Sequence, residues 1–279
     1  MADVASASKV KELREMTGAG IMDCKQALSD AKGDLEAAKD LLRKKGLASA
    51  QKRANREVKD GQVFVESNGQ MGILAEVACE TDFVAKTEDF QKLGQFIIAQ
   101  IKTSSENIIT SDAIKTQVQA VIGKIGENIA VRRAVKFETK SGFVASYRHH
   151  NHKIGILVEL AFQKPELAKQ EEVIKTARDI AMQTAALRPQ FLKPEEVSPE
   201  FLEREKNIFR DQVKDKPAAA QDKIIEGKLR KRFEEICLLN QKSVIDNSKS
   251  VETVVAELGK KLGDQITVKR FCRFEIGVE

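Results

Sequence analysis

Thr81, Asp82, Phe83 and Val84 form the segment whose residue types and position most strongly suggest a function. They follow an apolar, strand-like run at 73–79 and precede a helical pattern, so a carboxylate and a large ring stand at a strand-to-helix corner. One interpretation is structural: Asp82 caps the next helix and Phe83 packs that helix onto the core. The other is functional, because an exposed ring beside a charge suits another protein's pocket. Local sequence favours the structural interpretation, and the rest of the chain favours the functional one.

None of the common catalytic motifs accompanies this corner. The Gly-Lys-Ile-Gly segment at 123–126 lacks the spacing of a phosphate-binding loop. Neither a Gly-x-Ser-x-Gly nucleophile motif nor a zinc-binding His-Glu-x-x-His occurs. The sequence therefore favours a protein that acts by contact, with no enzymatic activity and no cofactor.

The cysteines and histidines do not predict a metal site. Cys24, Cys79, Cys237 and Cys272 are scattered without a Cys-x-x-Cys pair, so we expect buried free thiols. The three histidines cluster within 149–152 and could bind a metal ion. No carboxylate or thiol lies close by in the sequence, and a polar hairpin loop is the favoured interpretation.

Length and composition indicate a globular protein of two or three small domains. The chain has 279 residues, of which 42% are hydrophobic and 32% charged. Its longest apolar runs, such as 96–99, are too short to span a membrane. The first eight residues lack the basic and apolar regions of a secretory signal. We therefore expect a cytoplasmic protein without a membrane partner.

The charge pattern does not predict nucleic-acid binding. The net charge of +5 is the difference between 47 basic and 42 acidic residues, which are interleaved along the chain. The most basic stretches, 43–56 and 228–232, lie on helical patterns and are expected to be solvated faces. With no Trp and one Tyr, a base-stacking surface is poorly supported. No direct contact with nucleic acid is expected.

Residues 6–46 show the apolar spacing of three short helices, the first of which has Val10, Leu13 and Met16 on one apolar face. We expect the third helix to begin after Asp34 and to end at Gly46, because aspartate favours helix starts and glycine favours helix ends. The polar, basic stretch 48–58 resembles a helical linker. The pattern predicts a small N-terminal module with its linker over residues 1–54.

The rest of the chain alternates between strand and helix patterns. Asn68-Gly69 is a strong hairpin signal between two strand-like runs. The predicted strands are 62–66, 71–79, 129–139, 143–147, 154–161 and 266–276. The predicted helices are 88–101, 111–123, 171–186 and a segment around 254–258. This order indicates an α+β fold with helices packed on antiparallel sheets.

Residues 187–240 differ from their surroundings. Prolines at 189, 194 and 199 predict a stiff, non-helical lead. Two helical patterns with narrow apolar stripes and highly charged outer faces then follow, with Pro217 at the bend between them. They predict an antiparallel coiled-coil hairpin that protrudes from the sheet domain it interrupts.

Four stretches together resemble one protein family, bacterial translation elongation factor Ts. The longest are 10–25 (VKELREMTGAGIMDCK) and 80–86 (ETDFVAK), which are similar to the two family signatures. Residues 126–129 (GENI) and 146–149 (SYRH) are similar to two shorter landmarks. The helical hairpin matches the family's protruding coiled coil in place and type.

The resemblance implies an architecture for the whole chain. It implies a ubiquitin-associated-like, three-helix N-terminal module followed by a duplicated α+β core. Residues 55–140 would form the first half of the core. Residues 141–186 and 241–279 would form the second half, with 187–240 as the inserted hairpin.

The resemblance also implies a mechanism and a partner. The family exchanges guanine nucleotide on the GTPase elongation factor Tu. The contact segment is matched by Thr81, Asp82, Phe83 and Val84, of which the residues matched by Asp82 and Phe83 press into the GTPase near its Mg²⁺ site. Residues matched by Leu13, Ile21 and Met22 touch the nucleotide domain, and Ile125 and His149 are expected to make weaker contacts. A homodimer of the complex is compatible with the resemblance.

Two departures and two alternatives accompany this expectation. The sequence stops directly after the last predicted strand, where some members carry a further helix, and the loop 149–152 departs from the family's small turn. The alternatives are a ubiquitin-associated-type adaptor and an RNA-binding, ribosome-associated factor. An adaptor would leave 80–86 without a purpose, and an RNA-binding factor would show steeply salt-dependent affinity.

Overall fold

The computed structural model describes residues 5–104 and 108–278. The first four residues of the predicted N-terminal module lie outside the described residues. The chain forms two compact units. The first unit contains Met1–Phe64, Ala75–Ala134 and Glu275–Glu279, and the second contains Val65–Leu74 and Val135–Phe274. Each unit is described by itself below.

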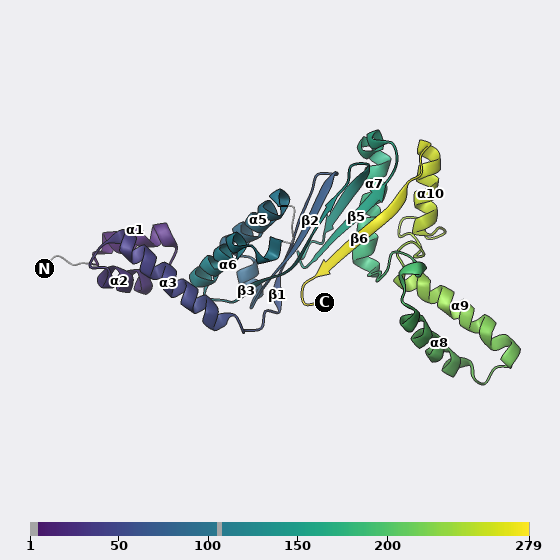
Figure 1. Ribbon diagram of the computed structural model, residues 1–279, viewed down its shortest axis with the longest axis horizontal. Coiled ribbons are helices and arrows are strands. Elements are labelled where there is room, and N and C mark those ends of the chain that lie inside the picture. The colour runs from purple at the N-terminus through teal and green to yellow at the C-terminus, as the bar shows by residue number, and fades with distance from the viewer. Residues whose placement is uncertain (1–4, 105–107, 279) are drawn as a thin grey trace. The chain divides into compact units, whose positions relative to one another are not determined.

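The first unit begins with the three predicted helices, α1 (Ala7–Thr17), α2 (Ile21–Asp30) and α3 (Leu35–Arg53) (Figure 1). Asp34 caps α3 by accepting a hydrogen bond from the backbone N–H of Ala37. The small core between the helices consists of Leu13, Cys24, Ala27, Leu28 and Ala38. The prediction of a three-helix start is confirmed.

The predicted end of the third helix at Gly46 is wrong. Helix α3 continues through Gly46 to Arg53 and packs on α6 (Asp112–Ile125). A Cβ atom on Gly123 of α6 would lie 2.9 Å from the Cα atom of Gly46, so the close approach of the two helices requires glycine at position 123. Gly46 therefore lies at a contact between two helices and does not end its own helix.

Each half of the core contains a three-stranded antiparallel sheet, as predicted. The first sheet has the order β1 (Asp60–Ser67), β2 (Met71–Cys79), β3 (Ile129–Glu138). The second has the order β4 (Gly142–Arg148), β5 (Ile154–Ala161), β6 (Thr267–Glu275). Antiparallel pairing of β4 with β5 places Gly142 opposite Ala161 and Arg148 opposite Gly155. The middle strands β2 and β5 are almost continuously buried, which explains their long apolar runs.

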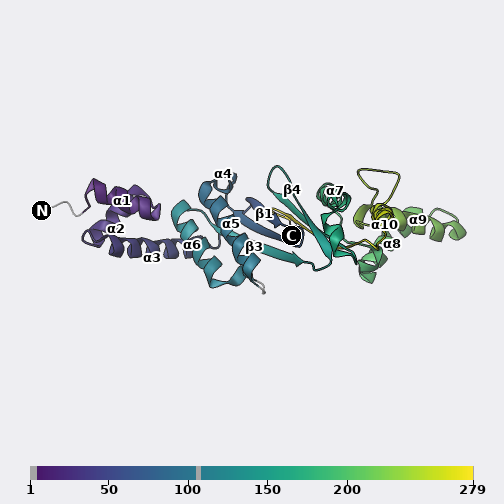
Figure 2. The same ribbon diagram turned by 90° about the horizontal axis from the view of Figure 1, so that it is seen from above.

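Helices complete each half of the core. The short helix α4 (Asp82–Ala85) leads directly into α5 (Glu88–Thr103) (Figure 2), and α6 precedes β3. In the second unit, a 3₁₀ turn η2 (Pro165–Lys169) leads into α7 (Glu171–Leu187). Helices α7 and α10 (Val251–Leu262) contribute to the core of the second unit. That core contains Ile156, Val158, Leu160, Val173, Ala177, Ile180, Val251, Val255 and Leu258.

The middle strands of the two sheets repeat one sequence pattern. The segment 72–79 reads Gly-Ile-Leu-Ala-Glu-Val-Ala-Cys, and 155–162 reads Gly-Ile-Leu-Val-Glu-Leu-Ala-Phe. Both segments are followed by a short helical corner and then a long helix. The two halves are therefore copies of one β–corner–α plan, consistent with the duplication that the resemblance implied.

The glutamates of this repeat are buried and carry equivalent ion pairs. Glu76 on β2 accepts from Arg133 Nε of β3 at 2.6 Å. Glu159 on β5 accepts from Arg270 Nε of β6 at 2.5 Å and from Lys269 Nζ at 3.0 Å. A buried carboxylate is costly unless it is paired, so each sheet depends on a cation from its third strand.

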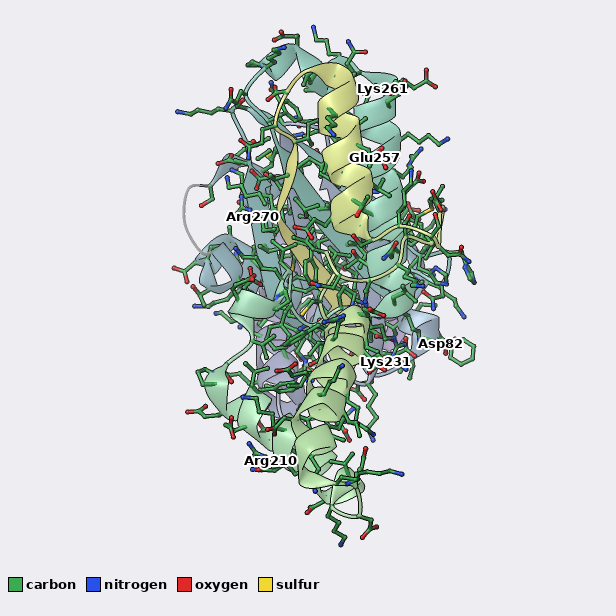
Figure 3. The ribbon with its side chains drawn as sticks, turned by 90° about the vertical axis from the view of Figure 1, so that its right-hand side faces the viewer. Asp82, Arg210, Lys231, Glu257, Lys261 and Arg270 are labelled. Carbon is green, nitrogen blue, oxygen red and sulfur yellow. The ribbon has the colours of Figure 1, made fainter. Side chains whose placement is uncertain are left out.

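The predicted helical hairpin consists of α8 (Pro199–Val213) and α9 (Ala218–Ile236), which contact each other. Pro199 is the first residue of α8, so it belongs to the helix and not to the lead as predicted. At the base, the backbone N–H of Gln190 donates to the carbonyl of Ile236 at 2.8 Å, which holds the two ends together. Figure 3 shows Arg210 on α8 and Lys231 on α9 among the many charged side chains of the hairpin.

Candidate functional site

The corner after β2, residues 81–86, is built around the short helix α4. Thr81 is the N-cap of α4, and its hydroxyl oxygen accepts from the backbone N–H of Val84 at 3.4 Å. The structural interpretation assigned this cap to Asp82, and that assignment is wrong. Asp82 is instead the first residue of α4 and accepts from Lys86 Nζ at 2.6 Å. Figure 3 places Asp82 at the surface.

Phe83 points its ring into solvent. Its exposed fraction is 78%, although Val84 and Ala85, the next two residues, are buried. The ring therefore does not pack α4 onto the core, as the structural interpretation required. Within the corner, Val84 and Ala85 anchor the backbone, while Phe83 remains available for a partner.

Polar contacts hold both ends of α4. At its start, the Glu127 carboxylate accepts from the backbone N–H of Thr81 at 3.1 Å and from its hydroxyl at 2.9 Å. At its end, the side-chain amides of Gln62 and Gln91 donate to the carbonyl oxygen of Ala85 at 2.8 and 2.7 Å. A four-residue helix is too short to be stable by itself, so these contacts define its position.

Cys79 lies beneath the corner as a buried free thiol, as predicted. Its Sγ donates to the carbonyl oxygen of Thr81 at 3.1 Å. Burial, reinforced by the negative charges of Asp60 and Glu127, raises the pKa of Cys79 to about 12. The thiol therefore stays protonated at neutral pH and acts as a structural donor, not as a nucleophile.

The predicted N-terminal contact residues separate into two kinds. Ile21 and Met22, at the start of α2, are 56% and 76% exposed. Leu13 is completely buried in the helix-bundle core, so it supports this surface from beneath and presents no contact area of its own. Met16 lies on the other side of the turn and is 47% exposed, although its spacing suggested a core position.

Lys124 contacts both the N-terminal turn and helix α5 within the first unit. The side chain of Lys124, near the end of α6, lies against Gly18 in the turn before Ile21 and donates to Asp89 of α5 at 2.6 Å. Ile125 is half-buried at the end of α6, two residues before Glu127. Ile125 thus lies in the sequence between Lys124, which contacts the N-terminal turn, and Glu127, which holds Thr81.

His149 belongs to the second unit, in the predicted polar loop between β4 and β5. Its Nδ1 lies 3.0 Å from the hydroxyl of Tyr147, and its backbone N–H donates to the carbonyl of Ile154 at 3.0 Å. Burial, together with the charges of Arg148 and His150, lowers the pKa of His152. Within the part of the chain that the structure describes, no group of three or more His, Cys, Asp or Glu residues is arranged to hold a metal ion.

Together these features place an exposed aromatic ring on a firmly held backbone, an arrangement that suits contact with another protein. Comparisons with known proteins identify its family. The family model described as elongation factor TS matches residues 80–278. Elongation factor Ts of Aquifex aeolicus is 41% identical over 292 residues, covering 98% of each chain. The protein of the same name from Clostridium acetobutylicum is 41% identical over 286 residues, covering 98% of this chain and 92% of that protein. The chain belongs to the elongation factor Ts family.

Two features of the first unit were not predicted as parts of the site. Met16 was assigned to an apolar helix face, and exposure at a helix end cannot be read from that spacing. Glu127 was noted only as part of a short motif, because its contact with Thr81 depends on the pairing of β2 with β3.

No helix within 5–104 and 108–278 is both long enough and apolar enough to cross a membrane.

Proposed function

We propose that residues 81–86 are the part of this protein that drives GDP release from elongation factor Tu. As a family member, the chain is a nucleotide exchange factor for elongation factor Tu in translation elongation and is not an enzyme. The proposal concerns which surface does this work. The exposure of Phe83 on a firmly held backbone carries it, because the fold gains little from a solvated ring.

A contact mechanism is sufficient for this activity. A GTPase holds its nucleotide through phosphate-loop amides, a lysine and Mg²⁺, so a ring and a carboxylate that displace these groups weaken that hold without a covalent step. By linkage, nucleotide weakens the binding of the exchange factor by the same factor. Each tenfold effect requires about 1.4 kcal/mol of contact made with the nucleotide-free state. One buried aromatic contact can supply this energy.

The remaining predicted residues are proposed to add affinity. Ile21 and Met22 offer exposed apolar area at the start of α2, with Leu13 supporting them from the core. Ile125 and His149 are only partly exposed and are proposed to contribute less. Because these surfaces do not include Phe83, binding and nucleotide release should be separable by mutation.

The test is the release of a fluorescent GDP analogue from elongation factor Tu, followed with increasing concentrations of this protein. Phe83→Ala should slow the maximal release rate by about thirtyfold, which corresponds to about 2 kcal/mol, while the melting temperature changes little. Leu187→Ala is the matched control, because Leu187 is also an exposed apolar residue but ends α7 in the second unit. An unchanged release rate with the wild-type chain would overturn the function itself.

The domain boundaries also enter as a proposal: the hairpin 187–240 is an arm that can be shortened. Val197, Ile236 and Cys237 pack at its base with Phe191, Phe201, Leu202 and Phe233, so the cut should leave these residues in place. Replacing 203–232 with a short Gly/Ser linker should keep the melting temperature of the core and reduce exchange only modestly. Loss of nearly all exchange in a folded variant would place the main contact on the hairpin.

A further inference from the structure

The orientation of Phe83 depends on contacts made by its neighbours. Its ring is mostly in solvent, so its direction is set by the backbone of α4. That backbone starts at Thr81, whose hydroxyl has one proton to donate and lone pairs to accept with. Glu127 takes the proton, at 2.9 Å, which leaves the oxygen to accept from the N–H of Val84. The carboxylate therefore fixes the rotation of the hydroxyl that caps α4.

The chain delivers Glu127 to this position through the end of α6. Gly126 adopts a left-handed conformation, with φ of 85°, and its N–H donates to the carbonyl of Ile122 at 2.8 Å. The next residues enter β3, which pairs with β2, so Glu127 arrives beside Thr81 at the same end of the sheet. A reciprocal contact closes the junction: Glu80 accepts from the backbone N–H of Asn128 at 2.7 Å.

We propose that Glu127 is a positioning residue for nucleotide exchange. It acts by holding Thr81, so that α4 presents Phe83 in one orientation. The inference rests on the proposed function of residues 81–86. A ring that samples several orientations inserts less often into the partner, so the loss should appear in the maximal release rate and less in the half-saturating concentration.

The second unit supplies a matched control. There Gly263 also ends a helix in the left-handed conformation, and Asp264 follows it as Glu127 follows Gly126. Asp264 accepts from the backbone N–H groups of Gln163 and Lys164 at the corner after β5, at 3.1 and 2.7 Å. Asp264→Ala therefore removes an equivalent acidic contact from a corner that carries no exposed aromatic residue.

The experiment compares Glu127→Ala, Glu127→Gln and Asp264→Ala in the full chain, using fluorescent GDP release from elongation factor Tu. Glu127→Ala should lower the maximal rate about tenfold. Glu127→Gln should stay within about threefold of wild type, because an amide oxygen in the place of Glu127 Oε2 can still accept from both the N–H and the hydroxyl of Thr81. Asp264→Ala should leave the rate unchanged. Hydrogen exchange at the amide of Val84 should accelerate in Glu127→Ala alone.

A second cycle tests whether Glu127 acts through the ring. In a Phe83→Ala background, Glu127→Ala should slow release no further, because there is no ring left to position. An additive loss, or an equal loss in Asp264→Ala, would overturn the inference and assign Glu127 a general structural role. If the wild-type chain accelerates release and Phe83→Ala slows it, while Glu127→Ala does not, the inference fails and the proposed function stands. If the wild-type chain does not accelerate release, the proposed function fails first.

Discussion

In the first unit the corner after β2 reads Asp-Phe-Val-Ala-Lys (82–86), and in the second unit the corner after β5 reads Pro-Glu-Leu-Ala-Lys (165–169). Both follow a Gly-Ile-Leu-x-Glu-x-Ala strand, both form one short helical turn, and both lead into a long helix. The third position is a buried apolar residue in each corner, Val84 or Leu167. These shared positions are what the duplicated fold requires.

The two corners differ in chemical character at the positions of Phe83 and Thr81. Phe83 corresponds to the exposed Glu166, so the corner can be built with a charged residue at this position. Thr81, which caps α4 with its hydroxyl, corresponds to Lys164, whose Nζ donates to the carbonyl of Gly263 at 2.9 Å. The comparison teaches that the ring is not a requirement of the fold, which supports its assignment to partner binding.

The largest expected effect comes from exchanging the two residues at this position. Phe83→Glu places the second corner's residue in the first, and it should reduce GDP release by well over thirtyfold, because a charge would have to be buried at the contact. The melting temperature should change by only a degree or two, since surface substitutions usually have small effects. The release assay and a thermal melt on the same sample measure both quantities.

The reverse substitution sharpens this prediction. Glu166→Phe adds a ring to the second corner and should leave the release rate unchanged, because position alone does not make that corner a contact site. If Phe83→Glu instead unfolds the chain, the ring contributes to the core and the comparison of the two corners is misleading.

The sequence predicted the strands and most helix limits, because alternation, long apolar runs and turn residues report on local structure. The residues around Phe83 favoured packing on the core, because exposure depends on what lies above the residue in three dimensions, and only the family resemblance of the whole chain favoured the functional interpretation. Gly46 is a second position at which the local sequence pattern does not predict the three-dimensional structure. Its local pattern predicts a helix end, but the helix continues to Arg53 and contacts Gly123 of α6, which is distant in the sequence.

The buried position of each corner should affect stability in both units but exchange in only one. Leu167→Ala should lower the free energy of unfolding by about 2–5 kcal/mol, and Val84→Ala by about 1–3 kcal/mol, since both side chains are buried. At a temperature where both variants remain folded, only Val84→Ala should slow GDP release, because it loosens the anchor of α4. Urea denaturation provides the stability values. Equal slowing by both variants would show that the rate follows global stability.

A smaller effect is expected from the ion pair on the first corner. Lys86→Ala should change the stability very little, because its pair with Asp82 lies at the surface. Asp82→Ala should cost equally little, since Thr81 and not Asp82 caps α4. Their effects on exchange should differ: losing the carboxylate should slow release severalfold, while losing the lysine should not. Parallel slowing by both variants would mean that the ion pair, not the carboxylate, is what the partner requires.

The smallest expected effect concerns acid and distinguishes two carboxylates of the second unit. Burial acts to raise the pKa of Asp264, but hydrogen bonds from the backbone N–H groups of Lys164, Gln163 and Gln265 outweigh it and lower that pKa below its usual 3.8. A lowered pKa means that the carboxylate stabilises the fold above its unfolded-state pKa and that this contribution disappears as pH falls through the folded-state value. Asp264→Asn should therefore be less stable than wild type at neutral pH, and the difference should shrink as the pH falls from the unfolded-state pKa through the lower folded-state pKa. The pKa of Asp179 is shifted in the opposite direction. Burial raises it, although the positive charges of Lys175 and Arg178 act to lower it. Asp179→Asn should be at least as stable as wild type at neutral pH, and that advantage should vanish on acidification. Melting temperatures of the three proteins across this range test the assignment, and parallel curves for the two variants would contradict it.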